Sequence, residues 1–108
     1  MANWTLTAER TGTTIVVSLH DTLTVVLEEN PTTGYHWALD IASAEFFEIL
    51  KSDFVPSPGG AVGRGGTRSI SLGCKKAGRG LLQLKLKRAW SGEASGAQPF
   101  RVEVDVKA

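Results

Sequence analysis

Hydrophobic and polar residues alternate along most of this chain, and such alternation predicts strands with one buried face. From Phe100 to Val106 every second residue is apolar, and the residues between them are charged. The same alternation recurs in six further segments, which are Trp4–Ala8, Ile15–Leu19, Leu23–Leu27, Trp37–Ile41, Ile70–Leu72 and Leu82–Leu86. Repeated strands separated by Gly, Pro and Asn are typical of an antiparallel sandwich or barrel. The predicted fold class is therefore all-β.

Three connections between the predicted strands have an unusual composition. The first, residues 30–37, reads Asn-Pro-Thr-Thr-Gly-Tyr-His-Trp. The second, residues 56–66, holds five of the twelve glycines and two of the four prolines. The third, residues 89–99, places Trp90 just beyond a strand. These connections are longer or more elaborate than a minimal hairpin turn requires.

Strand direction predicts that these three connections lie together. Residues 44–48 could form a helical turn, and residues 49–55 read as extended. If every strand crosses the domain once and reverses direction, then the strands that end near Glu29, Val55 and Arg88 all end on the same side. Three loops clustered in this way form the binding surface of variable immunoglobulin domains.

The first connection is built to hold its shape. Asn30 can bond to its own downstream backbone, Pro31 presets φ, and Gly34 permits a positive φ. Thr32 and Thr33 then carry two hydroxyl groups at the tip. The plainer interpretation is a well-made turn in front of a tryptophan that belongs to the core.

Length and composition indicate a single domain that spans residues 1–108. The hydrophobic fraction of 42% and the charged fraction of 21% are ordinary for a globular protein. No apolar run approaches the roughly 18 residues of a membrane span, so we expect no membrane partner. No signal peptide is visible, which predicts a cytoplasmic protein as the sequence is written, or a secreted one if a leader has been removed.

The formal net charge of +1 hides an uneven distribution. Between Phe54 and Gly92 there is no Asp or Glu, yet eight of the twelve basic residues fall in this stretch. One interpretation is a solvated strand face whose lysines discourage edge-to-edge pairing. The other is attraction to an acidic partner surface.

Catalytic and metal-binding patterns are weak in this sequence. Cys74 has no other cysteine to pair with and no nearby histidine, and His20 and His36 lack partners at a suggestive spacing. Glu28 and Glu29 point to opposite faces of a strand and so do not form a carboxylate dyad. The basic stretch lacks the interleaved aromatic residues of a nucleic-acid platform. We therefore expect a binding module with no cofactor, no metal and no nucleic-acid partner.

These residues resemble the chagasin-like inhibitors of papain-family cysteine peptidases. That family consists of immunoglobulin-like β-sandwiches with an Asn-Pro-Thr-Thr-Gly-Tyr/Phe loop, a Gly-x-Gly-Gly loop and an Arg-Pro-Trp loop. The three motifs correspond, in the same order, to Asn30–Tyr35, Gly63–Gly66 and Arg88–Trp90. The resemblance extends from about Leu6 to Val106.

The chain departs from the family pattern at two positions. Ala89 replaces the family's proline, which removes a φ constraint and raises the entropy lost when that loop becomes ordered. Arg64 is bulky and charged, and we expect it to tune the preference among peptidases.

The resemblance implies a monomeric, reversible inhibitor rather than an enzyme, with an immunoglobulin-like antiparallel β-sandwich fold. Its three loops would occlude the active-site cleft of a cathepsin L-like peptidase, while Trp37 would anchor the first loop in the core. The implied protease-binding residues are Asn30, Pro31, Thr32, Thr33, Gly34, Tyr35, Gly63, Arg64, Gly65, Gly66, Arg88, Ala89 and Trp90. The alternative is an immunoglobulin-like module that binds another protein or a glycan with the same loops.

Overall fold

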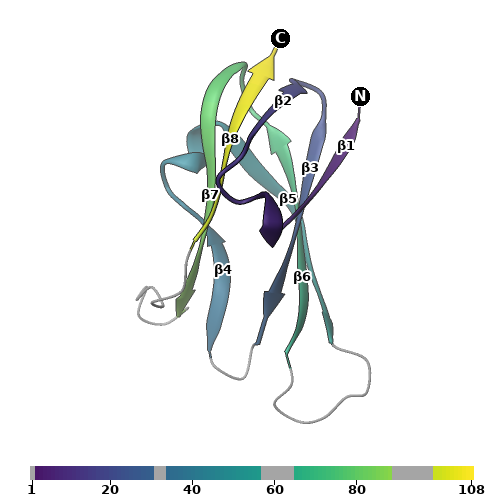
Figure 1. Cartoon of the computed structure of the whole chain (residues 1–108), viewed down its shortest axis with the longest axis vertical. Helices are drawn as coiled ribbons and strands as arrows, with labels where there is room; N and C mark the ends of the chain where they lie inside the picture. The colour runs from purple at the N-terminus through teal and green to yellow at the C-terminus, as the bar shows by residue number, and fades with distance from the viewer. Residues whose placement is uncertain (1, 31–33, 57–64, 89–98) are drawn as a thin grey trace.

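The structure is a computed structural model that describes residues 2–30, 34–56, 65–88 and 99–108. Within these residues it contains eight strands and two single-turn 3₁₀ helices (Figure 1). The elements in chain order are β1 (Asn3–Thr7), η1 (Ala8–Arg10), β2 (Thr14–Ser18), β3 (Thr22–Glu29), β4 (Tyr35–Leu39), η3 (Ser43–Glu45), β5 (Phe47–Pro56), β6 (Gly66–Cys74), β7 (Gly78–Arg88) and β8 (Phe100–Lys107). No helix among the described residues is long and apolar enough to cross a membrane.

The strands form two four-stranded sheets, with the orders β1-β3-β6-β5 and β2-β8-β7-β4. Each strand runs opposite to the one before it along the chain. Because β2 lies in the other sheet, β1 and β3 become neighbours that run the same way, and their pairing is parallel. Strands β2 and β8 also run the same way in this alternation, so their pairing is parallel. The other four pairings are antiparallel. The predicted sandwich is confirmed, with these two parallel pairs as an addition to the antiparallel pattern.

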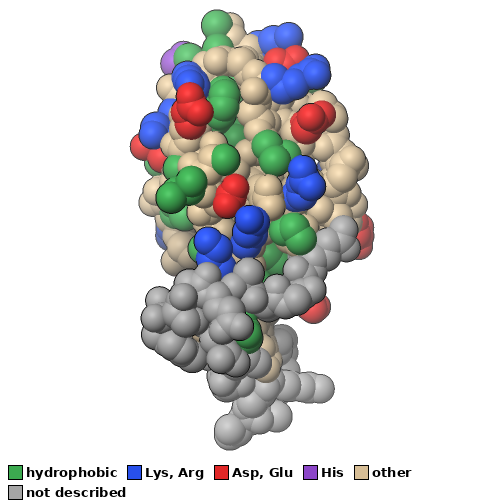
Figure 2. All heavy atoms as spheres, turned by 90° about the vertical axis from the view of Figure 1, so that its left-hand side faces the viewer, with side chains coloured by type: hydrophobic (Ala, Val, Ile, Leu, Met, Phe, Trp, Pro, Cys, Tyr) green, Lys and Arg blue, Asp and Glu red, His purple; other side chains and the backbone are tan. Residues whose placement is uncertain are grey.

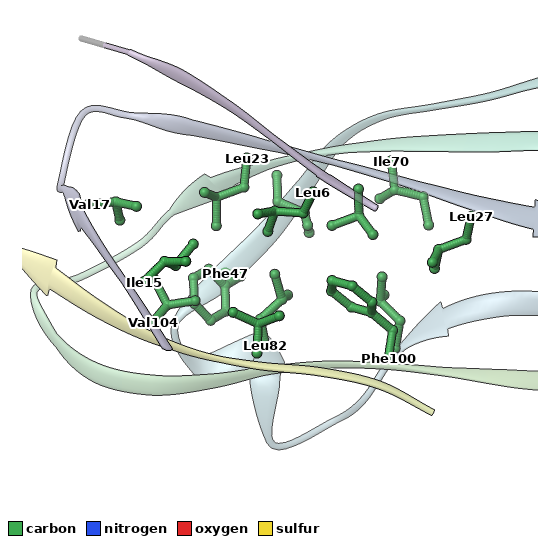
Figure 3. Packing of buried hydrophobic residues seen from close by; sticks show 14 of the residues in the cluster. Leu6, Ile15, Val17, Leu23, Leu27, Phe47, Ile70, Leu82, Phe100 and Val104 are labelled. Atoms are coloured by element: carbon green, nitrogen blue, oxygen red, sulfur yellow. The ribbon is translucent and has the colours of Figure 1, made fainter. Parts of the chain in front are cut away.

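The core lies between the two sheets and follows the predicted alternation. Figure 3 shows Leu23 and Ile70 of one sheet facing Leu82 and Phe100 of the other. The buried hydrophobic residues are Leu6, Ile15, Val17, Leu23, Val25, Leu27, Phe47, Ile70, Leu72, Leu82, Leu84, Phe100, Val102, Val104 and Val106. Every one of the predicted alternating segments except Trp37–Ile41 contributes to this group.

The segment after β4 differs from its prediction. The strand ends at Leu39 rather than at Ile41, whose side chain is 91% exposed. The chain turns because the Ser43 amide donates to the carbonyl of Asp40, and η3 follows. Buried Ser43 then fixes this turn to β7, since its hydroxyl donates to the carbonyl of Leu81 and accepts from the amide of Gln83. The helical turn predicted over residues 44–48 is thus present as a single 3₁₀ turn over Ser43–Glu45, and residues 47 and 48 already belong to β5.

Candidate protease-binding site

The strand ends that flank the three unusual connections lie at one end of the sandwich. In the first sheet, Gly66 at the start of β6 is in register with both Glu29 at the end of β3 and Pro56 at the end of β5. In the second sheet, Tyr35 at the start of β4 is in register with Arg88 at the end of β7. Figure 1 shows these ends together at the bottom of the view. The strand directions predicted from the sequence are therefore confirmed.

Six of the thirteen predicted site residues fall in the described part of the chain. These are Asn30, Gly34, Tyr35, Gly65, Gly66 and, as backbone only, Arg88. The other seven lie outside the described residues, and they are Pro31, Thr32, Thr33, Gly63, Arg64, Ala89 and Trp90. The structure therefore shows the bases of the three loops.

The base of the first loop has the predicted geometry. Gly34 has a φ of 82°, a left-handed conformation that favours glycine. Trp37, two residues into β4, packs against the core, and its indole N–H donates to the carbonyl of Glu28 at 2.8 Å. Because Glu28 belongs to β3, the tryptophan ties the strand after the loop to the strand before it. The predicted packing of Trp37 against the core is confirmed, and its role as the anchor of the loop stays a prediction.

Two glycines at the base of the second loop have no room for a side chain. A Cβ atom on Gly65 would lie 2.7 Å from the carbonyl oxygen of Glu29. One on Gly66 would lie 2.2 Å from the carbonyl oxygen of Val55 and 2.7 Å from the ring of Phe54. These contacts give a physical reason for the paired glycines: they let the backbone of β6 enter between β3 and β5.

An ion pair between buried Glu29 and partly exposed Arg68 also lies at this end, and neither residue is among the predicted site residues. The carboxylate of Glu29 accepts hydrogen bonds from Nε and Nη2 of Arg68 at 3.0 and 2.7 Å. Its other oxygen accepts from the backbone amide of Trp37 at 2.9 Å. The guanidinium of Arg68 also lies over the ring of Phe54, 5.4 Å from its centroid.

The described residues hold no group of three or more His, Cys, Asp or Glu side chains that could bind a metal ion. Cys74 is half-buried at the end of β6, and burial raises the pKa of its thiol above the usual value. A raised pKa makes a thiol less nucleophilic at neutral pH. The clustered strand ends suit binding by loops.

Comparison with known proteins decides which kind of binding domain this is. The family model described as Chagasin family peptidase inhibitor I42 matches residues 16–104. The chain belongs to the chagasin family of peptidase inhibitors. The predicted family is therefore confirmed, and so is the prediction of an inhibitor rather than an enzyme.

Individual chagasin-family members are similar over nearly the whole chain. Amoebiasin-1 of Entamoeba histolytica is 29% identical over 104 residues, which cover 94% of this chain and 98% of that protein. Chagasin of Trypanosoma cruzi is 26% identical over 101 residues, which cover 90% and 92%. The crystal structure of EhICP2, a cysteine protease inhibitor from Entamoeba histolytica, has a TM-score of 0.82 at 27% identity and covers 99% of this chain and 97% of that one.

Proposed function

We propose that this chagasin-family chain inhibits papain-family cysteine peptidases by filling the active-site cleft with three loops. The loops are those that contain residues 30–35, 63–66 and 88–90. The observation that carries the proposal is the convergence of their flanking strand ends at one end of the sandwich. A wedge of three adjacent loops matches an elongated cleft, and such interfaces bury roughly 800 Å² per partner.

Each loop would have a different task in the complex. Thr32 would approach the catalytic Cys–His pair, where its hydroxyl can form hydrogen bonds. Gly34 and Pro31 would hold the backbone so that no carbonyl carbon reaches the position for attack. The inhibitor would therefore occupy the cleft without being cleaved.

The other two loops would supply backbone pairing and an aromatic contact. Glycines at 63, 65 and 66 would allow close approach to the cleft wall and strand-like pairing of the kind that peptide substrates use. Trp90 would pack on an apolar shelf on the other side, and Arg88 would donate hydrogen bonds or brace that loop. Trp and Arg are enriched among the residues that dominate protein interfaces.

Titration of papain and of a cathepsin L-like peptidase tests the proposal. We expect reversible inhibition of both enzymes, and no inhibition of either at micromolar concentration would contradict it. The double substitution Thr32→Ala and Trp90→Ala should weaken inhibition by about a hundredfold or more, because each removes a central contact. Because the proposal assigns both side chains to the interface rather than to the core, the Tm of this variant should stay within about 2 °C of the wild-type value.

A matched control uses the opposite end of the sandwich. Arg79 is exposed at the start of β7, the strand whose other end is Arg88. Arg79→Ala should leave the inhibition constant unchanged. If the loop double variant inhibits as strongly as Arg79→Ala, then a different surface binds the peptidase.

A further inference from the structure

Glu29 lies at a position where the alternation along β3 predicts a hydrophobic residue. It follows Leu23, Val25 and Leu27 on the inward face of β3, and its side chain is fully buried. Burial of a carboxylate costs several kcal/mol of solvation, and a hydrophobic residue of similar size would often serve stability as well or better. A charged residue at this position therefore calls for a reason beyond packing.

The contacts of Glu29 connect the two sheets. Arg68, which binds one carboxylate oxygen with two nitrogen atoms, belongs to β6 in the same sheet as Glu29. The amide of Trp37, which binds the other oxygen, belongs to β4 at the edge of the opposite sheet. Nδ1 of His36, also on β4, lies 3.8 Å from the carboxylate. An aliphatic side chain would fill the space but could accept none of these hydrogen bonds.

The same carboxylate lies at the base of two inhibitory loops. Glu29 is the last residue before the first loop, and its contacts with β4 bind the strand that leaves that loop. Arg68 lies two residues after Gly66 and contacts Phe54 and Ser52 on β5, the strand that enters the glycine-rich loop. The strands on both sides of both loops are thus held through one carboxylate.

We propose that Glu29 is a positioning residue for inhibition, and that its ion pair with Arg68 sets the placement of the strand ends that carry the first loop and the glycine-rich loop before the peptidase binds. The inference rests on the proposed function. Loops that are placed in advance lose less conformational entropy on binding. Loss of the pair therefore weakens inhibition even in a protein that remains fully folded.

Four variants separate positioning from stability. Glu29→Gln keeps an oxygen that can accept from the Trp37 amide but removes the charge that pairs with Arg68. Arg68→Lys keeps the positive charge but replaces two donors in a fixed plane with one ammonium group. Glu28→Gln and Glu28→Ala are the matched controls, because Glu28 is the adjacent residue and its side chain is exposed on the outer face of β3.

The readout is the inhibition constant for papain at 25 °C, measured on samples whose melting curves show full folding at that temperature. A purely structural role would leave the inhibition constant of a folded variant unchanged. We expect Glu29→Gln to raise it about tenfold, Arg68→Lys to raise it by a smaller factor, and both Glu28 variants to leave it unchanged.

Three results would overturn the proposal. The first is a folded Glu29→Gln or Arg68→Lys variant that inhibits as strongly as the wild type. The second is failure of both variants to fold, which would assign the pair to stability alone. The third is a wild-type protein that inhibits neither papain nor a cathepsin L-like enzyme. Only this third result also contradicts the proposed function. Failure of the positioning proposal alone is therefore distinguishable from failure of the proposed function.

Discussion

Asp21 shows how one side chain can fix a whole strand. It is buried at the turn between β2 and β3, and its carboxylate accepts hydrogen bonds from the amides of Ser18 and Ala2 and from the indole N–H of Trp4. Two of these donors belong to the N-terminal segment, which also pairs with β3 and buries Leu6 in the core. The hydrogen bond from the Ser18 amide, followed by those from Trp4 and Ala2, lowers the pKa of Asp21 from 3.8 to about 2.

This lowered pKa predicts a loss of stability in acid. A carboxylate whose pKa is lower in the folded state stabilises the fold fully above its unfolded pKa of 3.8, and this contribution disappears as the pH falls through about 2. Asp21→Asn should therefore lower the Tm at pH 7, and the difference from the wild type should shrink as the pH falls from about 4 toward 2. Thermal melts followed by circular dichroism across this range provide the measurement.

The control is Asp53→Asn, which removes an exposed carboxylate paired only with Lys51 among the described residues. Exposed pairs contribute little to stability, so its Tm should follow the wild type at every pH. A Tm difference for Asp21→Asn that stays constant down to pH 2 would show that the carboxylate charge does not matter there.

At the scale of elements, period-two alternation accounts for how much of the fold the sequence could predict. Leu82, Leu84 and Leu86 predict β7, because the residue at each inward position is apolar. The direction of each strand then predicts at which end of the sandwich the loops lie. Alternation does not predict the ion pair between Glu29 and Arg68. A charged residue at the end of an alternating hydrophobic pattern does not indicate which residue of the neighbouring strand it contacts. The pairing of Glu29 with Arg68 depends on the register between β3 and β6, which alternation leaves open.

Strand β6 offers an internal comparison of two glycines. At Gly66 a Cβ would lie 2.2 Å from the carbonyl oxygen of Val55, whereas at Gly73 it would lie 3.4 Å from the nearest atom, on the side chain of Leu50. Gly66→Ala should reduce the free energy of unfolding by about 1–3 kcal/mol, because β5 and β6 must move apart. It should also weaken inhibition, because this pairing forms the base of the glycine-rich loop.

Gly73→Ala is the matched control on the same strand. Its φ is not positive, and the three atoms nearest to its new methyl group would all belong to the flexible side chain of Leu50, so stability should change by less than about 1 kcal/mol. Urea denaturation of both variants provides the measurement. Equal loss of stability in the two would mean that the close approach at Gly66 is not what makes glycine necessary.

At the scale of the whole molecule, the basic residues that the structure describes within residues 65–87 do not form one continuous positive surface. Arg68 pairs with buried Glu29, Lys76 pairs with Glu45, and Lys85 lies 3.5 Å from Asp40. Lys76 also follows β6, at the end opposite the loops. Figure 2 shows the side of β4 and β7, where basic and acidic side chains are interspersed and a few basic ones gather toward the loop end. This distribution favours the interpretation as a solvated strand face.

The charge distribution predicts that binding to the peptidase depends only weakly on salt. Electrostatic steering accelerates association by about 10- to 1,000-fold when a large field of one sign faces its opposite. Here the net charge is +1, and among the described residues Arg68 is paired with Glu29 at the base of the loops, so steering should be slight. We expect the association rate constant with papain, measured by stopped-flow, to fall by no more than about threefold between roughly 50 and 500 mM salt.

A fall of more than about tenfold would show that a field of one sign guides the encounter. Lys87→Gln would then test whether Lys87 contributes to that field, because Lys87 lies on the outer face of β7 near the loops and forms no ion pair with another described residue.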